Sequence, residues 1–360
     1  MGIMSSLLQL LLEVLSIPSP TFSESAKVKI IKTWFSEHFL DCEITEFDDS
    51  LLVTFPSAQE LPHLCLVGHS DTVPKFFTPH ESNGRVYGSG ASDMQAGFVG
   101  MMWFLHQHIQ DLRLKYRVSF ILYSREEGTG LTQNGLYSLI HQFPDFFKSI
   151  DLAIVGEPTN LTVQLGCVGS IHVTVKVPGL PAHSARPWDG RNALYEALPF
   201  LTRVSHIAPL PVDIEGVRFF DVVQVTECQA EPGRTTVPGW FQCNINYRFS
   251  PRFSLEEAKS HFIDTLHRCG AHLTWITVLD AVPAGQIVSS PLLDQVVSSL
   301  GVTTEAKQAW TDVAQLAQLG ISAFNFGPGL TAQAHLPDEY VLLADVDQYV
   351  HYLKRLFTGG

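Results

Sequence analysis

Residues 63–71 read HLCLVGHSD, and this stretch decides the fold. Its apolar run ends at Gly68, a pattern typical of a short strand buried on both faces of a sheet. Two later runs have the same character, VSFILY at residues 118–123 and LAIV at residues 152–155. A helical pattern at residues 96–109 separates the first of these strands from the second. Strands that alternate with helices predict an α/β fold with a mostly parallel sheet between helices.

The segments on either side extend this pattern. Residues 5–40 predict two helices separated by a loop at residues 18–20. EITEF and LLVTF, at residues 43–47 and 51–55, predict two short strands around a turn. Near the other end of the chain, AFNF at residues 323–326 is a further strand candidate.

The middle of the chain has a different pattern. Apolar residues alternate with period two at residues 170–177 and 242–248, which indicates half-exposed strands. Helical stretches at residues 190–205 and 254–268 accompany them. We therefore expect one discontinuous domain, residues 1–167 and 280–360, interrupted by a smaller α+β domain over residues 168–279.

Composition excludes several functional classes. Of the 360 residues, 45% are hydrophobic and 16% are charged, as in ordinary globular proteins. The formal net charge of −13 would repel a phosphate backbone, so we expect no nucleic-acid partner. No run of about 18 apolar residues is present, so we expect no membrane span. The cysteines are scattered without a paired motif, which favours a reducing cytoplasm: Cys42, Cys65, Cys167, Cys228, Cys243 and Cys269.

Histidines and carboxylates gather after the predicted buried strands. His69 and Asp71 follow the first strand, Glu126 and Glu127 follow the second, and Glu157 follows the third. Asp93 lies in the glycine-rich loop GSGASDM at residues 88–94, and His335 lies in a loop near the C-terminus. Open α/β sheets bind their ligands at the ends of strands, so we expect these side chains to meet at one site.

Two histidines and three carboxylates are a ligand set that suits zinc, and two cations can share one bridging carboxylate. Such a pair polarises a scissile carbonyl and activates a shared water. Of the adjacent Glu126 and Glu127, one is expected to bind metal while the other takes a proton from water and passes it to the leaving nitrogen. Asp71 is positioned to orient the imidazole of His69.

The motifs together resemble a known family, the zinc exopeptidases and deacylases. This family includes aminoacylases, glutamate carboxypeptidases, acetylornithine deacetylase and succinyl-diaminopimelate desuccinylase. The resemblance rests on motifs that span the chain in the family's order: GHSDTVP at 68–74, GSGASDM at 88–94, EEG at 126–128, GEPT at 156–159, and GPG with AHLPDE at 327–339.

The resemblance implies a role for each residue. It gives His69 and Glu157 to one zinc, Glu127 and His335 to the other, and Asp93 to both, with cobalt or manganese as acceptable substitutes. It makes Glu126 the general base and Asp71 the support of His69. The inserted domain resembles the family's lid, which also forms a homodimer contact. His183 resembles the histidine that reaches across that dimer to stabilise the tetrahedral oxyanion.

Within the family, the strongest resemblance is to actinobacterial-type succinyl-diaminopimelate desuccinylases. It implies hydrolysis of N-succinyl-LL-2,6-diaminopimelate to LL-diaminopimelate and succinate, in lysine and cell-wall precursor synthesis. Supporting segments are HSARPWDGRN at 183–192, NYRFSP at 246–251 and TDVA at 311–314. Because this substrate is rich in carboxylates, guanidinium groups are expected to bind it. The expected substrate contacts are Arg248, Arg186, Arg191, Arg234, Thr311, Gly327 and Gly329.

Several positions depart from the family pattern and bear on the substrate. Gln95 stands where members often carry lysine, and Arg125 stands where many carry Asp or Asn. Val168 replaces an arginine found in some members, and Thr235 lies where an asparagine is expected. The segment at residues 327–339 is equally similar to acetylornithine deacetylase, so N-acetylornithine or another N-acyl amino acid is the alternative substrate. A third hypothesis is a non-catalytic metal-binding homologue, which would have no need of Glu126.

Overall fold

The computed structural model describes residues 6–357, and contacts among Cα atoms divide them into two compact units. Unit 1 contains the residues up to Gly166, Ile287–Glu305, and the residues from Thr311 onward. Unit 2 contains Cys167–Gln286 together with Ala306–Trp310. No described helix is both long and apolar enough to cross a membrane.

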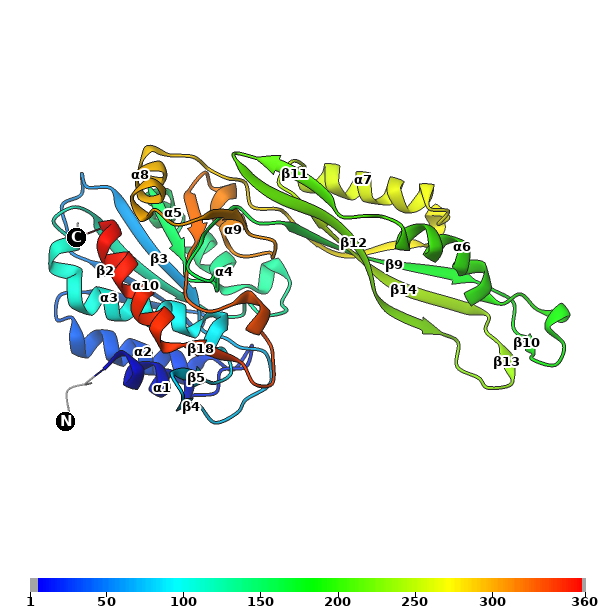
Figure 1. The fold of residues 1–360 in the computed structure, drawn as a ribbon, viewed down its shortest axis with the longest axis horizontal. Coiled ribbons are helices and arrows are strands. Elements are labelled where there is room, and N and C mark those ends of the chain that lie inside the picture. Colours follow the sequence, from blue (N-terminus) through cyan, green and yellow to red (C-terminus); the bar gives the residue numbers. More distant parts are fainter. Residues whose placement is uncertain (1–5, 358–360) are drawn as a thin grey trace. The chain divides into compact units, whose positions relative to one another are not determined.

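Unit 1 is built on an eight-stranded sheet (Figure 1). Its four central strands run parallel, and the strands at one edge pair antiparallel. In spatial order the strands are β1 (Glu43–Phe47), β2 (Ser50–Phe55), β6 (Arg117–Tyr123), β3 (His63–His69), β7 (Leu152–Val155), β17 (Ser322–Asn325), β8 (Val163–Leu165) and β16 (Thr304–Ala306). The stretch at residues 63–69 lies at the centre of this sheet, buried throughout. The predicted α/β fold with a mostly parallel sheet is confirmed.

Helices lie on both faces of this sheet (Figure 1). They are α1 (Leu7–Leu15), α2 (Ser25–His38), α3 (Ala96–Leu112), α4 (Gly135–Gln142), α5 (Pro144–Lys148), α8 (Pro291–Leu300), α9 (Val313–Gln318) and α10 (Leu343–Phe357). Helix α3 packs on β3 and also contacts α1 and α10. The start of α3 lies close to the loop after β7. A Cβ atom added to Gly97 would lie only 1.9 Å from the Gly156 carbonyl oxygen, so the approach requires glycine at this position. This approach brings the loop before α3 beside the loop that carries Glu157.

A small second sheet joins the C-terminal segment of unit 1 to residues 80–87. Its strands, in spatial order, are β18 (Tyr340–Leu342), β5 (Arg85–Tyr87) and β4 (His80–Ser82). Tyr340 pairs with Tyr87 in antiparallel register. The sheet therefore holds the segment after His335 next to the loop that follows β5, which carries Asp93.

Unit 2 contains a five-stranded antiparallel sheet, with two helices, α6 (Ala193–Ser205) and α7 (Leu255–Arg268), packed on it. In spatial order its strands are β11 (Leu210–Ile214), β12 (Val217–Ala230), β14 (Trp240–Phe249), β9 (Gly169–Pro178) and β15 (Ile276–Val282). Alternate residues of β9, such as Val173 and Val175, are fully buried in the core that also contains Phe200 of α6 and Phe262 of α7. A two-stranded ribbon, β10 (Ala182–His183) with β13 (Thr236–Val237), completes the unit.

Three strands of the main sheet in unit 2 were not predicted from the sequence: β11, β12 and β15. The alternating pattern of β12 is obscured because outward-facing positions include the apolar Phe220, which is 39% exposed. Strand β15 pairs with β9, and the expected domain boundary at residue 280 lies inside it. Residues 306–310 also pack in unit 2, where Lys307 accepts a backbone hydrogen bond from Val168.

Candidate metal centre

The site is organised around His69, the last residue of β3, which is fully buried. Its Nδ1 lies 3.1 Å from the backbone oxygen of Asp71, which orients the ring. The opposite nitrogen, Nε2, has no hydrogen-bond partner. It faces Asp93 Oδ1 at 3.6 Å and Glu157 Oε1 at 3.9 Å. A buried imidazole nitrogen aimed at two carboxylates without bonding to either has the arrangement of a metal ligand.

Asp93 connects this histidine to a second one. While its Oδ1 faces His69, its Oδ2 lies 3.6 Å from Nε2 of His335. His335 Nε2 also lies 2.9 Å from Oε1 of Glu127, the glutamate that follows β6. His69, Asp93 and Glu127 offer ligand atoms that all lie within 4.8 Å of one another. The two oxygens of one carboxylate thus face the two halves of the cluster.

Asp71 holds together the loops around His69. It is fully buried, and its Oδ1 lies 3.4 Å from His69 Nδ1. The same oxygen accepts the backbone N–H of Glu126 at 2.9 Å, and Oδ2 accepts that of Glu127 at 2.9 Å. The Thr21 hydroxyl donates to Oδ2 at 3.0 Å. Asp71 therefore fixes His69 and both glutamates with one side chain.

The cluster strongly perturbs its own ionisation. Burial alone would lower the pKa of His69, yet Asp71, Asp93 and Glu126 outweigh it and raise that pKa well above 6.5. Burial raises the pKa of Glu126; His69 opposes this and Glu127 reinforces it, so the pKa lies well above 4.5. The pKa of His335 rises to about 9, chiefly through its hydrogen bond to Glu127. Carboxylates crowded in a buried site favour bound cations.

These residues fit a pair of divalent cations. The unpartnered Nε2 of His69 supplies a lone pair, and Asp93, Glu127 and Glu157 supply oxygens on the same side. Zinc, cobalt and manganese all accept mixed imidazole and carboxylate ligands. The side chains predicted as ligands from the sequence are thus brought to one place by the loops after β3, β6 and β7, the loop before α3, and the segment before β18.

Other predicted site residues of unit 1 lie in the neighbouring loops. Thr311 is 1% exposed and stands just before α9. Gly327 accepts a backbone hydrogen bond from Thr159, and a Cβ atom on it would lie 2.5 Å from the Gly156 oxygen. Gly329 has a φ of +84° and would meet Ser92 Oγ at 2.4 Å if it carried a Cβ atom. Both glycines permit close approach between the loop that leads to His335 and the loops carrying Glu157 and Asp93.

The predicted residues of unit 2 do not form one group. His183 and Arg186 are exposed near the β10–β13 ribbon, and Ser184 bonds to Thr235, beside the exposed Arg234. Arg248 lies at the other end of the main sheet, where it pairs with Ser170, whereas Trp240 at the ribbon end pairs with Pro178. Eight residues of strand separate the two ends, about 25 Å. Arg248 Nε donates to Asn246 Oδ1 at 3.0 Å, and burial lowers its pKa.

The positions that depart from the family pattern have separate environments. Arg125 pairs with Asp48 through both carboxylate oxygens. Gln95 is fully buried, and neither polar atom of its amide has a hydrogen-bond partner. Val168 is buried in unit 2, and Thr235 is exposed.

No role was predicted for three further side chains: Thr21 and Glu339, which bond to residues of the centre, and Asp312, whose charge acts on His69 and Glu126. Asp312 is fully buried and accepts hydrogen bonds from Asn134 Nδ2 at 3.2 and 3.3 Å and from Gln315. Glu339 accepts three backbone hydrogen bonds from the loop of Asp93. Two of them lie in segments that carry the resemblance, since Asp312 is the second residue of TDVA and Glu339 ends AHLPDE.

Comparison with known proteins agrees with this geometry. The model of peptidase family M20/M25/M40 matches residues 65–358. The chain belongs to this family. A relative within it, the succinyl-diaminopimelate desuccinylase of Corynebacterium glutamicum, is 30% identical over 353 residues, which cover 96% of this chain and 94% of the relative. The predicted resemblance is confirmed, and the chain is a hydrolase that acts on amide bonds.

Solved structures of the family share the fold. The aminopeptidase PepT of Bacillus cereus superposes with a TM-score of 0.77 at 15% identity, covering 98% of this chain and 97% of that one. A Bacillus subtilis protein described as a dinuclear metal-binding peptidase of the M20 family gives a TM-score of 0.68 at 16% identity, covering 98% and 96%. At these identities the likeness concerns the fold.

Proposed function

We propose that this member of the family is a two-metal amidohydrolase with Glu126 as its general base. The observation that carries the proposal is the unpartnered Nε2 of buried His69, which faces the carboxylates of Asp93 and Glu157. A core histidine would have both ring nitrogens satisfied. The description of the Bacillus subtilis family member as dinuclear gives independent support for a pair of metals.

The proposed ligand assignment follows from the two carboxylate oxygens of Asp93, one of which faces His69 and the other His335. His69 and Glu157 would hold one cation, Glu127 and His335 would hold the other, and Asp93 would serve both. We propose zinc as the native metal, with cobalt or manganese able to replace it. When bound, such a pair polarises the scissile carbonyl and lowers the pKa of a shared water.

The remaining chemistry belongs to side chains of the protein. Glu126 accepts a proton from the attacking water and delivers it to the amide nitrogen as the C–N bond breaks. Water thus adds across the bond, leaving a carboxylate and a free amine. The backbone N–H of Glu126 donates to the Asp71 carboxylate at 2.9 Å, and this bond places the base beside the ligands. His183 would donate to the oxyanion of the tetrahedral intermediate.

We further propose N-succinyl-LL-2,6-diaminopimelate as the substrate, hydrolysed to LL-diaminopimelate and succinate. The Corynebacterium glutamicum relative bears the name of this activity and aligns over nearly its whole length. Arg248 supports the choice, because only its Nε has a hydrogen bond among the described residues while the guanidinium is half-buried. Its remaining donors suit a substrate carboxylate. Arg186, Arg234 and Thr311 are proposed as further contacts.

A homodimer formed through unit 2 is part of the proposal. Along the main sheet of unit 2, the end near the β10–β13 ribbon that carries His183 and the end that carries Arg248 are about 25 Å apart, a span longer than one small substrate. If His183 acts at the site of a second subunit, this separation is accounted for. Large apolar side chains are exposed on unit 2, including Trp188 at 76% and Tyr195 at 67%. Sedimentation analysis is expected to give twice the 39.9 kDa chain mass.

We also place the enzyme in the cytoplasm. All six cysteines are free thiols. A reducing compartment maintains thiols in this state.

A substrate panel tests the specificity. Succinyl-diaminopimelate, N-acetylornithine, N-acetylcitrulline and simple dipeptides would be compared by kcat/KM with the zinc-loaded protein. We expect the succinylated substrate to be preferred by at least about 100-fold, since the guanidinium donors of half-buried Arg248 are left unpaired by analogues that lack the succinyl carboxylate. A preference for an acetylated substrate would contradict the desuccinylase assignment and leave the amidohydrolase intact.

A further inference from the structure

Glu339 is a buried carboxylate beside the centre that is not among the proposed ligands. It is 2% exposed and lies four residues after His335. Its Oε1 accepts the backbone N–H groups of Ser92 at 2.8 Å and Asp93 at 2.9 Å. Its Oε2 accepts that of Gly90 at 2.9 Å. One side chain therefore binds three N–H groups of the loop that carries Asp93, from about 250 residues away in sequence.

The loop needs acceptors of this kind. Helix α3 is preceded by a kinked turn over Ala91–Gln95, in which the N–H of Ala91 bonds to the Gly88 oxygen at 3.0 Å while those of Gly90, Ser92 and Asp93 bond to Glu339. The loop backbone is irregular, with a φ of +80° at Gly90 and non-helical angles at Asp93. Its neighbours Ala91 and Ser92 are fully buried, so water does not replace a missing acceptor. Charge-assisted hydrogen bonds to buried N–H groups are strong and directional.

The main chain of Glu339 also joins the two segments. Its carbonyl oxygen accepts the N–H of Gly88 at 3.2 Å, at the start of the same loop. The next residue, Tyr340, pairs with Tyr87 in the small sheet. Glu339 therefore connects the loop of Asp93 to the segment of His335 through both its side chain and its backbone. Asp93 Oδ2 and His335 Nε2 face each other at 3.6 Å across this connection.

We infer that Glu339 is a positioning residue that sets the carboxylate of Asp93 relative to His335. This inference rests on the proposed two-metal function. Asp93 would serve both cations, but only the cation held by Glu127 and His335 has two of its ligands joined through Glu339. Loss of the Glu339 carboxylate therefore weakens that cation more than the one held by His69 and Glu157.

Metal titration of the full-length protein distinguishes this role from simple loop stabilisation. Metal-free wild type, Glu339→Gln and Glu339→Ala are titrated with Co²⁺ and followed by calorimetry and by the visible absorption of the bound cobalt. Glu81→Gln is the matched control, because Glu81 Oε1 accepts one backbone N–H, that of Gly84, in a turn of the same small sheet.

We expect Glu339→Ala to bind the cation held by Glu127 and His335 about 100-fold less tightly and Glu339→Gln about 10-fold less tightly, since residues that support metal ligands contribute on this scale. The glutamine keeps one acceptor oxygen but turns an NH₂ group toward an N–H donor. The affinity for the cation held by His69 and Glu157 changes by less than about 3-fold, and Glu81→Gln matches wild type. The spectrum of cobalt bound by Glu127 and His335 shifts in the variants, which a purely structural role would not produce.

Three outcomes are decisive. A folded Glu339→Ala protein that binds two cations with wild-type affinities and spectrum would overturn the inference and leave the proposed function standing. If Glu339→Ala does not fold, Glu339→Gln gives the same decision, because it preserves the shape of the side chain. A wild-type protein that takes up no cobalt or zinc would overturn the two-metal proposal and this inference together.

Discussion

Strand β3 carries a buried histidine at each end, and the two differ in what surrounds them. His63, at the start, has both ring nitrogens within 3.1 Å of hydroxyl or carbonyl oxygens of Ser119 and Ser149. His69, at the end, has one satisfied nitrogen and one that faces two carboxylates without a hydrogen bond. Residue type, strand and burial are shared, so the partners alone separate a core histidine from a candidate metal ligand.

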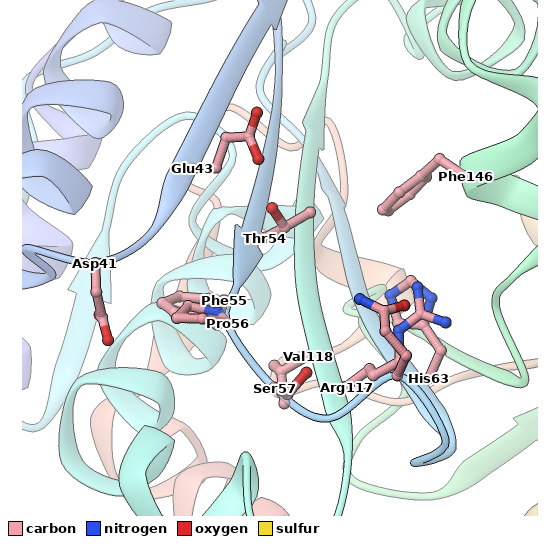
Figure 2. Close-up of a pocket in the computed structure, with 11 residues that line it drawn as sticks. Asp41, Glu43, Thr54, Phe55, Pro56, Ser57, His63, Arg117, Val118 and Phe146 are labelled. Carbon is pink, nitrogen blue, oxygen red and sulfur yellow. The ribbon is translucent and has the colours of Figure 1, made fainter.

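The two ends of β3 also differ in the charges and cavities around them. A cavity of about 410 Å³ lies at the amino end, beside His63, Arg117 and Glu43 (Figure 2). Burial and the charge of Arg117 lower the pKa of His63 to about 4, so its ring is neutral at pH 7. At the carboxyl end, neighbouring carboxylates raise the pKa of His69 despite its burial. Open sheets place ligands at carboxyl ends, and the charge pattern agrees with that rule.

The largest expected effect concerns a single carboxylate at the carboxyl end. Glu126→Gln removes the proposed proton carrier, and we expect kcat to fall by about 10³-fold to 10⁴-fold while two cations remain bound. Glu43→Gln, at the amino-end cavity, is the control and is expected to retain wild-type kcat. Steady-state kinetics with metal analysis measures both. Retained activity in Glu126→Gln would place the base elsewhere or favour the non-catalytic hypothesis.

A smaller effect is expected from the aspartates that accept backbone N–H groups at the two ends of β3. Asp71 accepts those of Glu126 and Glu127, whereas Asp151 accepts that of His63 at 2.7 Å. Asp71→Asn turns an NH₂ group toward one of these donors and removes the charge beside His69. We expect kcat/KM to fall about 100-fold, or about 2.7 kcal/mol, with unchanged kinetics in Asp151→Asn. Equal kinetics in the two variants would remove Asp71 from the catalytic arrangement.

The smallest effect concerns stability at the amino end. His63 has a pKa of about 4 when folded and about 6.5 when unfolded, so the unfolded chain binds more protons between these values. Stability therefore falls as pH drops through this window, and His63 contributes a loss of about 2 kcal/mol between pH 7 and pH 5. Urea unfolding of wild type and His63→Gln measures the contribution as the difference between their pH profiles. Parallel profiles would show that His63 is not buried as a neutral ring.

Much of the centre was predictable because each ligand directly follows an apolar run or sits in a glycine-rich loop. Parallel strands then bring their carboxyl ends to one edge, which explains why His69, Glu127 and Glu157 meet. The connections that hold them were not predictable from the pattern. The bonds from Asp71 to the backbone of Glu126 and Glu127 span about 55 residues, and nothing local to either segment indicates them.

Other features depend on tertiary contacts in the same way. Asp312 follows the predicted Thr311 in sequence, yet its role becomes visible only through Asn134, 178 residues away. The placement of Arg248 at the end of the main sheet away from the β10–β13 ribbon follows from strand register, which the alternating pattern of β9 and β14 does not specify. Strand β12 was missed because exposed apolar side chains break its alternation.

The metal content of His69→Ala, compared with that of His63→Ala, tests whether His69 is a metal ligand. Each protein would be loaded with zinc, dialysed against a fixed free-zinc concentration and analysed by mass spectrometry. We expect two zinc ions per chain in wild type and in His63→Ala, and at most one in His69→Ala, because of the two histidines only His69 directs an unpartnered nitrogen at the carboxylates. Two ions in His69→Ala, or none in wild type, would contradict it.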